Sequence, residues 1–258
     1  MLKLLLTLVI TSIPMLAQSV FSGTWRLNTS DAQVNVTEKF LLKDGLYSCS
    51  ACDPPIKNLI ADGRSHKVLG SPYYDAVSVR VIDDNTVEVV STKNTRMVDL
   101  SKITVSQDNQ TATRDETFTS QNGQQNHERD LWKRTADGPF GAHKISGTWQ
   151  PQKIEAASDS ITLITYKVTG NGLAMHDGQG DSYDAKFDGK DYPYNGDPGT
   201  TSVSLKKIDA NTFEETDKRK GKVMYIWRMT VEPDGKTMKI AIQDKLHATT
   251  LSFTATRQ

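Results

Sequence analysis

Ser22-Gly23-Thr24-Trp25, near the start of the chain, recurs further on as Ser146-Gly147-Thr148-Trp149. Each copy opens a segment of short alternating strands and turns, and each segment ends in a basic residue. The correspondence extends beyond this motif, because Val203-Ser204-Leu205 matches Val77-Ser78-Val79. The offset is 124 at the motif (147 minus 23) and 126 at the later match (203 minus 77). A near-constant offset over most of the chain indicates a duplicated domain.

Strand and turn patterns fill both repeats. The first repeat is expected to open with strands at residues 22–27 and 34–42. Val77, Val79 and Val81 alternate with polar residues in the period of two that is typical of a half-buried strand. No segment shows the period of 3.6 over the length of a helix. Many short strands joined by tight turns favour an antiparallel sandwich or an up-and-down barrel, and closure into a barrel removes exposed edges.

These patterns predict an all-β protein with two tandem antiparallel up-and-down β-barrels of roughly eight to ten short strands each. The first barrel is assigned to residues 18–134 and the second to residues 145–258. Residues 135–144 contain Asp137-Gly138-Pro139 and Gly141, a composition expected of a linker between domains. Each repeat is therefore expected to fold alone.

The start of the chain stands apart from the repeats. Lys3 gives it a positive charge, residues 4–13 are mainly apolar, and Ala17 offers a small residue before Gln18. This pattern predicts a signal peptide at residues 1–17, cleaved after about Ala17. The alternative, a membrane anchor, needs about 20 apolar residues, which is more than this run supplies. We therefore expect a secreted or periplasmic protein without stable membrane insertion.

The composition limits the classes of partner. The 258 residues include 31 Lys and Arg and 31 Asp and Glu, and 36% of the residues are hydrophobic. The chain can therefore bury a core, but its charge balance provides no basic field for nucleic acid. We expect no nucleic-acid partner.

The Gly-x-Trp motif on the first strand, with an Arg just after the last strand, resembles the lipocalin-like (calycin) barrels. The two copies together look like secreted bacterial proteins with a tandem lipocalin-like domain. In that family the Trp closes the barrel floor and the late Arg packs across its ring, which implies the pairs Trp25 with Arg134 and Trp149 with Arg257. A guanidinium on an indole stabilises by about 0.5–2 kcal/mol, and the alternative for each Trp is an ordinary core residue. The resemblance assigns barrel closure to Gly23, Trp25, Arg134, Gly147, Trp149 and Arg257.

Cys49 and Cys52 are the only cysteines. The prolines at positions 54 and 55 argue against a helix that would activate a redox pair, Asp53 stands where a c-type haem site needs His, and a structural zinc site needs more ligands. A disulfide in an exported protein is the plain interpretation. The ring is small, so the expected stabilisation is only about 2 kcal/mol.

No constellation of residues points to catalysis. The sequence contains no Gly-x-Ser-x-Gly motif, phosphate loop or dinucleotide fingerprint, and its five histidines are scattered. We therefore expect no enzyme activity, no cofactor and no metal site. The charged run at residues 214–219 is interpreted as a solvated edge that discourages strand addition.

The strand expected at residues 222–231 carries the candidate ligand site. Arg228 and Thr230 would point outward, which leaves Tyr225, Trp227 and Met229 on the inner face. These three residues either fill the second barrel or line a pocket for a small apolar ligand. The favoured function is a non-enzymatic binding module, and the alternative is a structural or interaction module of the cell envelope with filled barrels.

Overall fold

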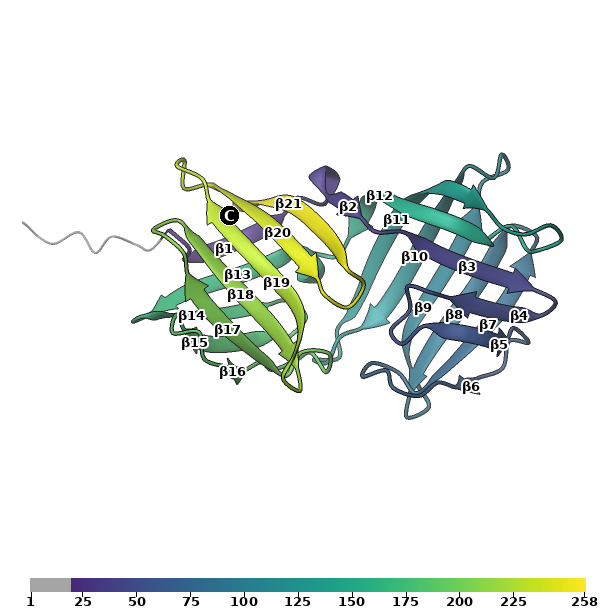
Figure 1. The fold of residues 1–258 in the computed structure, drawn as a ribbon, viewed down its shortest axis with the longest axis horizontal. Coiled ribbons are helices and arrows are strands. Elements are labelled where there is room, and N and C mark those ends of the chain that lie inside the picture. Colours follow the sequence, from purple (N-terminus) through teal and green to yellow (C-terminus); the bar gives the residue numbers. More distant parts are fainter. Residues whose placement is uncertain (1–19) are drawn as a thin grey trace, which may run out of the picture.

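The chain forms two β-barrels. The computed structural model describes residues 20–258, and the predicted signal peptide at residues 1–17 lies outside this range. Strands account for 61% and helices for 3% of the fold. The two antiparallel barrels have ten strands each, are nearly closed, and lie side by side along the longest axis of the molecule (Figure 1). The prediction of an all-β fold with two antiparallel barrels is confirmed.

The N-barrel comprises strands β3 to β12, in the sheet order β5-β4-β3-β12-β11-β10-β9-β8-β7-β6. Apart from β5 and β6, which end the path, strands that are consecutive in the chain are neighbours in the sheet, as in an up-and-down barrel. The strands are β3 (Glu38–Lys43), β4 (Leu46–Cys49), β5 (Ile56–Ile60), β6 (His66–Lys67), β7 (Ala76–Asp83), β8 (Thr86–Lys93), β9 (Arg96–Val105), β10 (Thr111–Thr119), β11 (Gln125–Asp137) and β12 (Gly147–Ala157).

The C-barrel has the sheet order β15-β14-β13-β1-β21-β20-β19-β18-β17-β16, and β2 pairs with β21 off this path. Its strands are β1 (Gly23–Leu27), β2 (Gln33–Asn35), β13 (Leu163–Thr169), β14 (Gly172–Asp177), β15 (Ser182–Lys186), β16 (Tyr192–Pro193), β17 (Ser202–Lys207), β18 (Thr212–Arg219), β19 (Lys222–Val231), β20 (Thr237–Asp244) and β21 (Thr249–Arg257). Helices η1 (Thr29–Asp31) and α1 (Asp159–Thr162) lie between strands.

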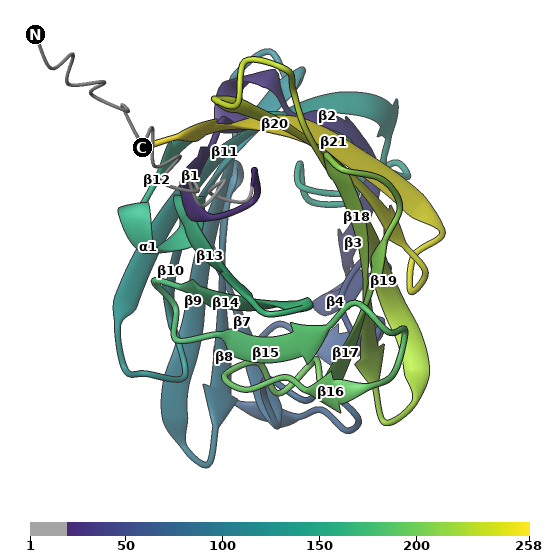
Figure 2. The same ribbon diagram turned by 90° about the vertical axis from the view of Figure 1, so that its left-hand side faces the viewer.

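The two repeats exchange their first strands. β1, from the first repeat, lies between β13 and β21 of the C-barrel, and β12, from the second repeat, lies between β3 and β11 of the N-barrel. Figure 2, which looks along the longest axis, shows β1 beside β13 in the nearer barrel. Neither barrel is therefore built from one repeat alone.

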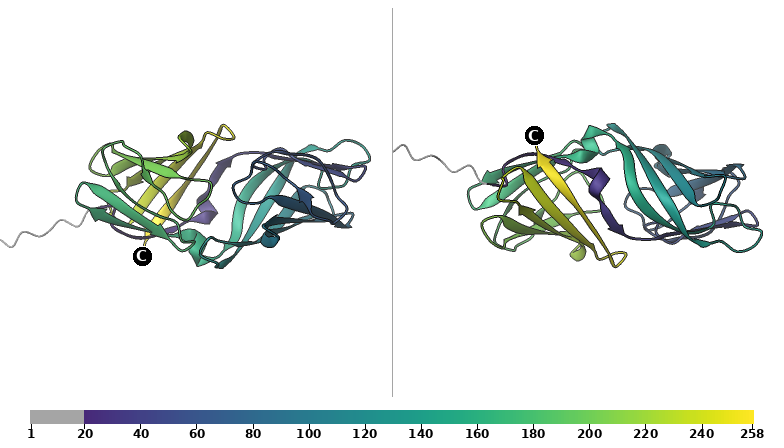
Figure 3. Two further views of the ribbon diagram at one scale, coloured as in Figure 1. Left: turned by 90° about the horizontal axis from the view of Figure 1, so that it is seen from below. Right: turned by 90° about the horizontal axis from the view of Figure 1, so that it is seen from above.

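The chain crosses between the barrels twice, at residues 28–37 and 158–162 (Figure 3). The single strand predicted at residues 34–42 is wrong, because Val34 pairs with Leu251 in the C-barrel whereas β3 belongs to the N-barrel. The Asp31 carboxylate fixes the first crossing on β21 by accepting hydrogen bonds from the Thr254 backbone N–H (3.2 Å) and hydroxyl (2.6 Å).

The predicted linker at residues 135–144 does not join the barrels. Ala136 pairs with Thr148 and Asp137 with Gly147, so this segment forms the hairpin between β11 and β12 within the N-barrel sheet. Its Gly and Pro residues serve a turn inside one sheet, which has the same composition as a linker. The prediction of an inter-barrel linker there is therefore wrong.

The closing Trp–Arg pairs follow the strand exchange. The Arg134 guanidinium lies 4.1 Å from the Trp149 ring centroid, and that of Arg257 lies 4.4 Å from the Trp25 ring. The implied pairs, Trp25 with Arg134 and Trp149 with Arg257, are therefore wrong, although the residues and their packing mode are as expected. The two sites are chemically identical, so the motif itself does not determine which Arg each Trp meets.

The same hydrogen bonds recur at both closures. Arg134 donates through Nε to the Asn109 carbonyl oxygen (2.6 Å) and through Nη1 to that of Ser146 (2.7 Å). Arg257 donates likewise to the carbonyl oxygens of Gly235 (2.8 Å) and Ser22. Each guanidinium, at the end of its repeat's last strand, thus binds the segment that precedes the closing Trp of its barrel.

The predicted disulfide between Cys49 and Cys52 is present. Asp53, the next residue, accepts a hydrogen bond from Arg219 Nη1 at 3.0 Å. Because Arg219 ends β18 of the C-barrel, the disulfide loop contacts the other barrel. Within residues 20–258, no helix has the length and apolar character needed to span a bilayer.

Candidate ligand-binding site

A partly buried arginine occupies the end of the N-barrel that faces the C-barrel. Arg114 on β10 places its guanidinium 5.3 Å from the Trp132 ring centroid. Its Nη2 lies 2.5 Å from Asp130 Oδ2 and 3.2 Å from a carboxylate oxygen of both Glu116 and Glu128. The strand register explains this arrangement, because Arg114 is directly opposite Asp130 and Glu116 is opposite Glu128.

Carboxyl groups outnumber the one guanidinium. Burial, followed by the charge of Asp130, raises the pKa of Glu128 to about 8. Burial also raises the pKa of Glu38 on β3, and the charge of Arg114 offsets this only in part. Asp99 on β9 behaves in the same way, since burial and then the charge of Glu116 raise its pKa to about 8. This group of side chains therefore retains protons that exposed carboxyls lose.

A cavity of about 230 Å³ lies at the junction of the two barrels. Its apolar walls come from both barrels and from both crossings, and its charged wall is the Arg114 group. The apolar lining comprises Leu27, Val34, Leu251 and Phe253 on the C-barrel side and Trp132, Pro151, Ile154 and Ile161 on the other. We call this space the junction cavity. Concave apolar space with a few convergent polar groups is the usual form of a small-molecule site.

A second cavity of about 230 Å³ lies inside the N-barrel. It shares Glu38, Arg114 and Trp132 with the junction cavity, so the two spaces adjoin across these side chains. Its lining also includes Asp99, whose Oδ2 atom is buried without a hydrogen-bond partner. The interior of the N-barrel is therefore more polar than the junction cavity.

Aromatic residues pack the interior of the C-barrel. The Phe213 ring contacts Phe21, Tyr166 and Phe187, with ring centroids 4.9–6.0 Å apart. Trp25 is 1% exposed in the same core. Packing of this kind fixes the shape of the barrel.

Two carboxyl groups are buried in this aromatic core. Glu215 and Asp217 on β18 are each 5% exposed. Tyr183 donates its hydroxyl hydrogen bond to Glu215 Oε2 (2.5 Å), and Trp227 donates its indole N–H to Asp217 Oδ2 (2.8 Å). The interpretation of residues 214–219 as a solvated edge is therefore wrong, because alternate residues of β18 point inward.

The structure places the predicted ligand residues on the inner face of β19. Met229 is 1% exposed in the C-barrel core, and Tyr225 and Trp227 pack against that core. Arg228 points outward, as expected. These three inner residues do not line the junction cavity, and their role in ligand binding stays a prediction.

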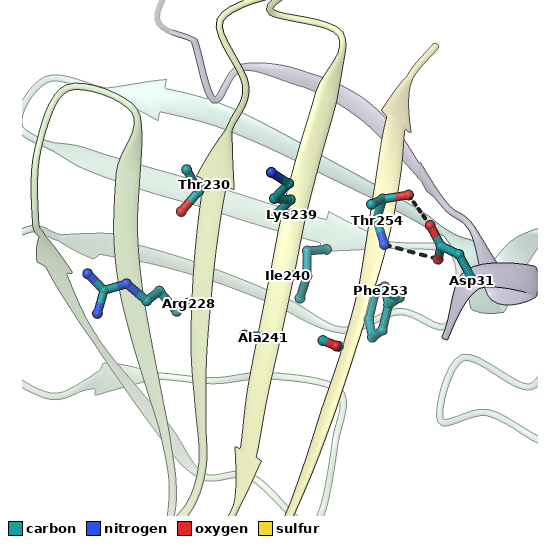
Figure 4. Close-up of a pocket in the computed structure, with 9 residues that line it drawn as sticks. Asp31, Arg228, Thr230, Lys239, Ile240, Ala241, Phe253 and Thr254 are labelled. Atoms are coloured by element: carbon teal, nitrogen blue, oxygen red, sulfur yellow. Dashed lines mark hydrogen bonds between the residues drawn. The ribbon is translucent and has the colours of Figure 1, made fainter. Parts of the chain in front are cut away.

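A shallow depression also lies on the outer face of β19, β20 and β21 (Figure 4). Figure 4 shows Arg228 and Lys239 on neighbouring strands, with Asp31 hydrogen-bonded to Thr254 at one edge. The Lys239 ammonium lies 3.0 Å from a carboxylate oxygen of Glu232, so its charge is already paired. This surface is open, so it removes less of a ligand from water than the junction cavity does.

Comparisons with known proteins add no relative. No family model matches the chain, and no curated protein matches it either.

Sequence reasoning missed the Arg114 group, although one signal was available. Ala112 and Trp132 are apolar residues that would be expected on the inner faces of their strands, and the structure shows each of them 1% exposed. Counting in steps of two from Ala112 reaches Arg114, and counting back from Trp132 reaches Asp130. The alternation thus places charged residues inward, where polarity alone suggests solvent.

We expect the free energy of unfolding to fall as pH rises from about 4 to about 8. Burial raises the pKa of Asp217 to about 7 and that of Glu128 to about 8 in the folded protein. Both carboxyls ionise near pH 4 in the unfolded chain, so unfolding releases protons within this window, and their contribution is fully present only below it. The expected loss is about 2–4 kcal/mol, measured by urea unfolding at a series of pH values.

Two variants test the source of this pH dependence. Asp217→Asn removes one titrating group and should flatten the profile, whereas Asp84→Asn, at an exposed turn position, should leave it unchanged. A wild-type stability that is constant or rises between pH 4.5 and pH 8.5 would contradict the assignment of buried, protonated carboxyls.

Proposed function

We propose that this protein is a secreted or periplasmic, non-enzymatic binding module that holds a small apolar ligand in the junction cavity. The observation that carries the proposal is the apolar lining of that cavity, to which both barrels contribute. The closure of each barrel by a Gly-x-Trp motif and an Arg supports the proposal, because this closure resembles that of the lipocalin-like barrels, which carry small molecules. The Cys49–Cys52 disulfide is compatible with an exported protein.

The size of the cavity sets the expected affinity. A ligand that loses about 200 Å² of apolar surface to the cavity gains about 5 kcal/mol from burial. Association entropy takes back part of this gain, so dissociation constants between micromolar and millimolar are expected. The proposal therefore describes weak binding of compact molecules with a single ring.

We expect 2-phenylethanol to bind and to change the fluorescence of Trp132, which lines the cavity. Ala32→Phe adds a ring to the cavity wall and should weaken binding at least about tenfold by occupying the space. The measurement is a fluorescence titration, supported by ligand-observed NMR.

Ala241→Phe makes the same substitution on the exposed outer face of β20 and should leave binding unchanged. Equal binding by wild type and Ala32→Phe would exclude the junction cavity as the site.

A structural or interaction module of the cell envelope is the second candidate. The packed C-barrel core supports it. So does Phe140, which is 99% exposed in the hairpin between β11 and β12. The absence of saturable binding by wild type in the same titration would favour this candidate.

A further inference from the structure

The charged wall of the junction cavity has an excess of acceptors. Arg114 is the one guanidinium among Glu38, Glu116, Glu128 and Asp130. It lies on Trp132, and its Nε and Nη2 atoms already donate to carboxylate oxygens of Asp130 and Glu128. Lys153 also lines the cavity, but its ammonium lies 3.1 Å from Glu155 and half of the side chain is exposed.

Glu38 is the group without a partner. It lines both adjoining cavities. Within residues 20–258, its carboxylate forms neither a hydrogen bond nor an ion pair at contact distance. In the adjoining cavity, Asp99 Oδ2 is likewise buried with no hydrogen-bond partner. Desolvated carboxylates without donors are costly, and a bound donor that carries positive charge would remove that cost.

We propose that the junction cavity binds a small amphiphilic cation, with a primary ammonium group against Glu38 and an apolar body against Leu27, Leu251 and Phe253. This inference rests on the proposed function and specifies its ligand class. An ammonium has three donors and matches a site rich in carboxylate acceptors. The apolar walls favour an organic cation, because they contribute affinity only to a ligand with apolar surface.

The protonation of the carboxyl groups at the site supports the same ligand class. The raised pKa of Glu128 means that a proton neutralises this carboxyl at neutral pH. The groups that face it are Arg114 and Glu116 from β10, Asp130 from β11 and, across the cavity, Glu38 from β3 and Lys153 from β12. The charge of His247, in the hairpin between β20 and β21 of the C-barrel, lowers the pKa of Glu38. Cation binding should therefore compete with protons and strengthen as pH rises from 6 to 8.5.

Three ligands of matched size test the proposal. They are 2-phenylethylammonium, 2-phenylethanol and phenylacetate, titrated against the full-length mature protein by calorimetry and Trp fluorescence. We expect the cation to bind at least about tenfold more tightly than the alcohol at pH 8, and the anion to bind most weakly. Its affinity should increase at least about threefold between pH 6 and pH 8.5, while that of the alcohol stays constant.

Glu38→Gln keeps the shape of the side chain and removes its charge, so it should abolish the preference for the cation over the alcohol. Glu232→Gln, on the outer face of the C-barrel, is the matched control and should retain the preference. Because the pH series uses wild type alone, the proposal remains testable if Glu38→Gln does not fold.

The outcomes separate the two proposals. Binding of the alcohol as tightly as the cation, or an unchanged cation preference in folded Glu38→Gln, would overturn the ammonium site and leave the apolar binding module in place. A cation affinity that is the same at both pH values would also overturn the ammonium site. Failure of all three ligands to bind wild type would overturn the proposed function as well.

Discussion

Residues 36–158 are expected to fold on their own, whereas the two sequence repeats, cut at Gly141, are not. The segment 36–158 contains all ten strands of the N-barrel, including β12 with its Trp149–Arg134 closure. Residues 18–141 lack β12, which leaves β3 and β11 without their shared neighbour. Residues 142–258 lack β1, which lies between β13 and β21.

The free energy lost with a missing strand, compared with the stability of a typical domain, explains why the repeats are not expected to fold. Removing a buried Trp alone costs about 3–5 kcal/mol, and loss of a central strand removes its backbone hydrogen bonds as well. A typical domain is stable by only about 5–15 kcal/mol, so either repeat loses most or all of its stability. Circular dichroism and urea unfolding of the three segments measure this difference.

One outcome would contradict the exchange as the basis of stability. If residues 18–141 unfolded cooperatively as a monomer, β1 would have turned back to fill the position of β12 in its own repeat. Residues 36–158 serve as the control for expression and solubility, because they have a similar length and every strand partner.

Gly147→Ala is expected to destabilise the protein by more than about 3 kcal/mol. Gly147 has φ +134°, and an added Cβ would lie 2.4 Å from the Ala136 carbonyl oxygen and 2.6 Å from Arg134 Nη1. The first neighbour is backbone in the paired strand and cannot move aside cheaply. The second is the guanidinium that covers Trp149, so the substitution disrupts the closure of the N-barrel.

Gly45→Ala is the matched control. Gly45 also has positive φ (+74°), but an added Cβ would meet nothing within 4 Å. Its expected cost is the conformational term alone, about 1 kcal/mol. Thermal and urea unfolding measure both variants, and equal losses of stability would show that conformation rather than the close approach to Ala136 determines the role of Gly147.

The sequence predicted the parts of the fold that depend on local patterns. The repeated Gly-x-Trp motif and the alternation around Val77 and Val79 indicated two antiparallel barrels, and both are present, although Val81 is 44% exposed. The spacing of Cys49 and Cys52 indicated the disulfide. Each of these inferences uses residues that are close in sequence.

The exchange of β1 and β12 could not be predicted in the same way. Trp25 and Trp149 carry equivalent motifs, so each fits either barrel, and what differs is the path of residues 28–37 and 158–162. That path depends on contacts between distant residues, such as Arg26 with Asp159 at 2.6 Å. Local periodicity contains no information about such contacts.

The candidate site was partly accessible from the sequence. Alternation placed Tyr225, Trp227 and Met229 on an inner face, and they do pack against the C-barrel core. The junction cavity was not accessible, because its lining comes from both barrels and from both crossings. Glu38 and Arg114 reach it from strands that are far apart in the chain, so their meeting depends on the closed barrel.

The pairing of the first strand with the last has a mechanical consequence. Trp25 lies opposite Arg257 in an antiparallel pair, so the chain enters β1 and leaves β21 at the same end of the C-barrel. A force that pulls the two ends apart would load the hydrogen bonds between these strands one after another, as a zip opens, rather than all at once. The N-barrel lies in the chain between β1 and β13, and it would bear no tension until β1 had peeled away.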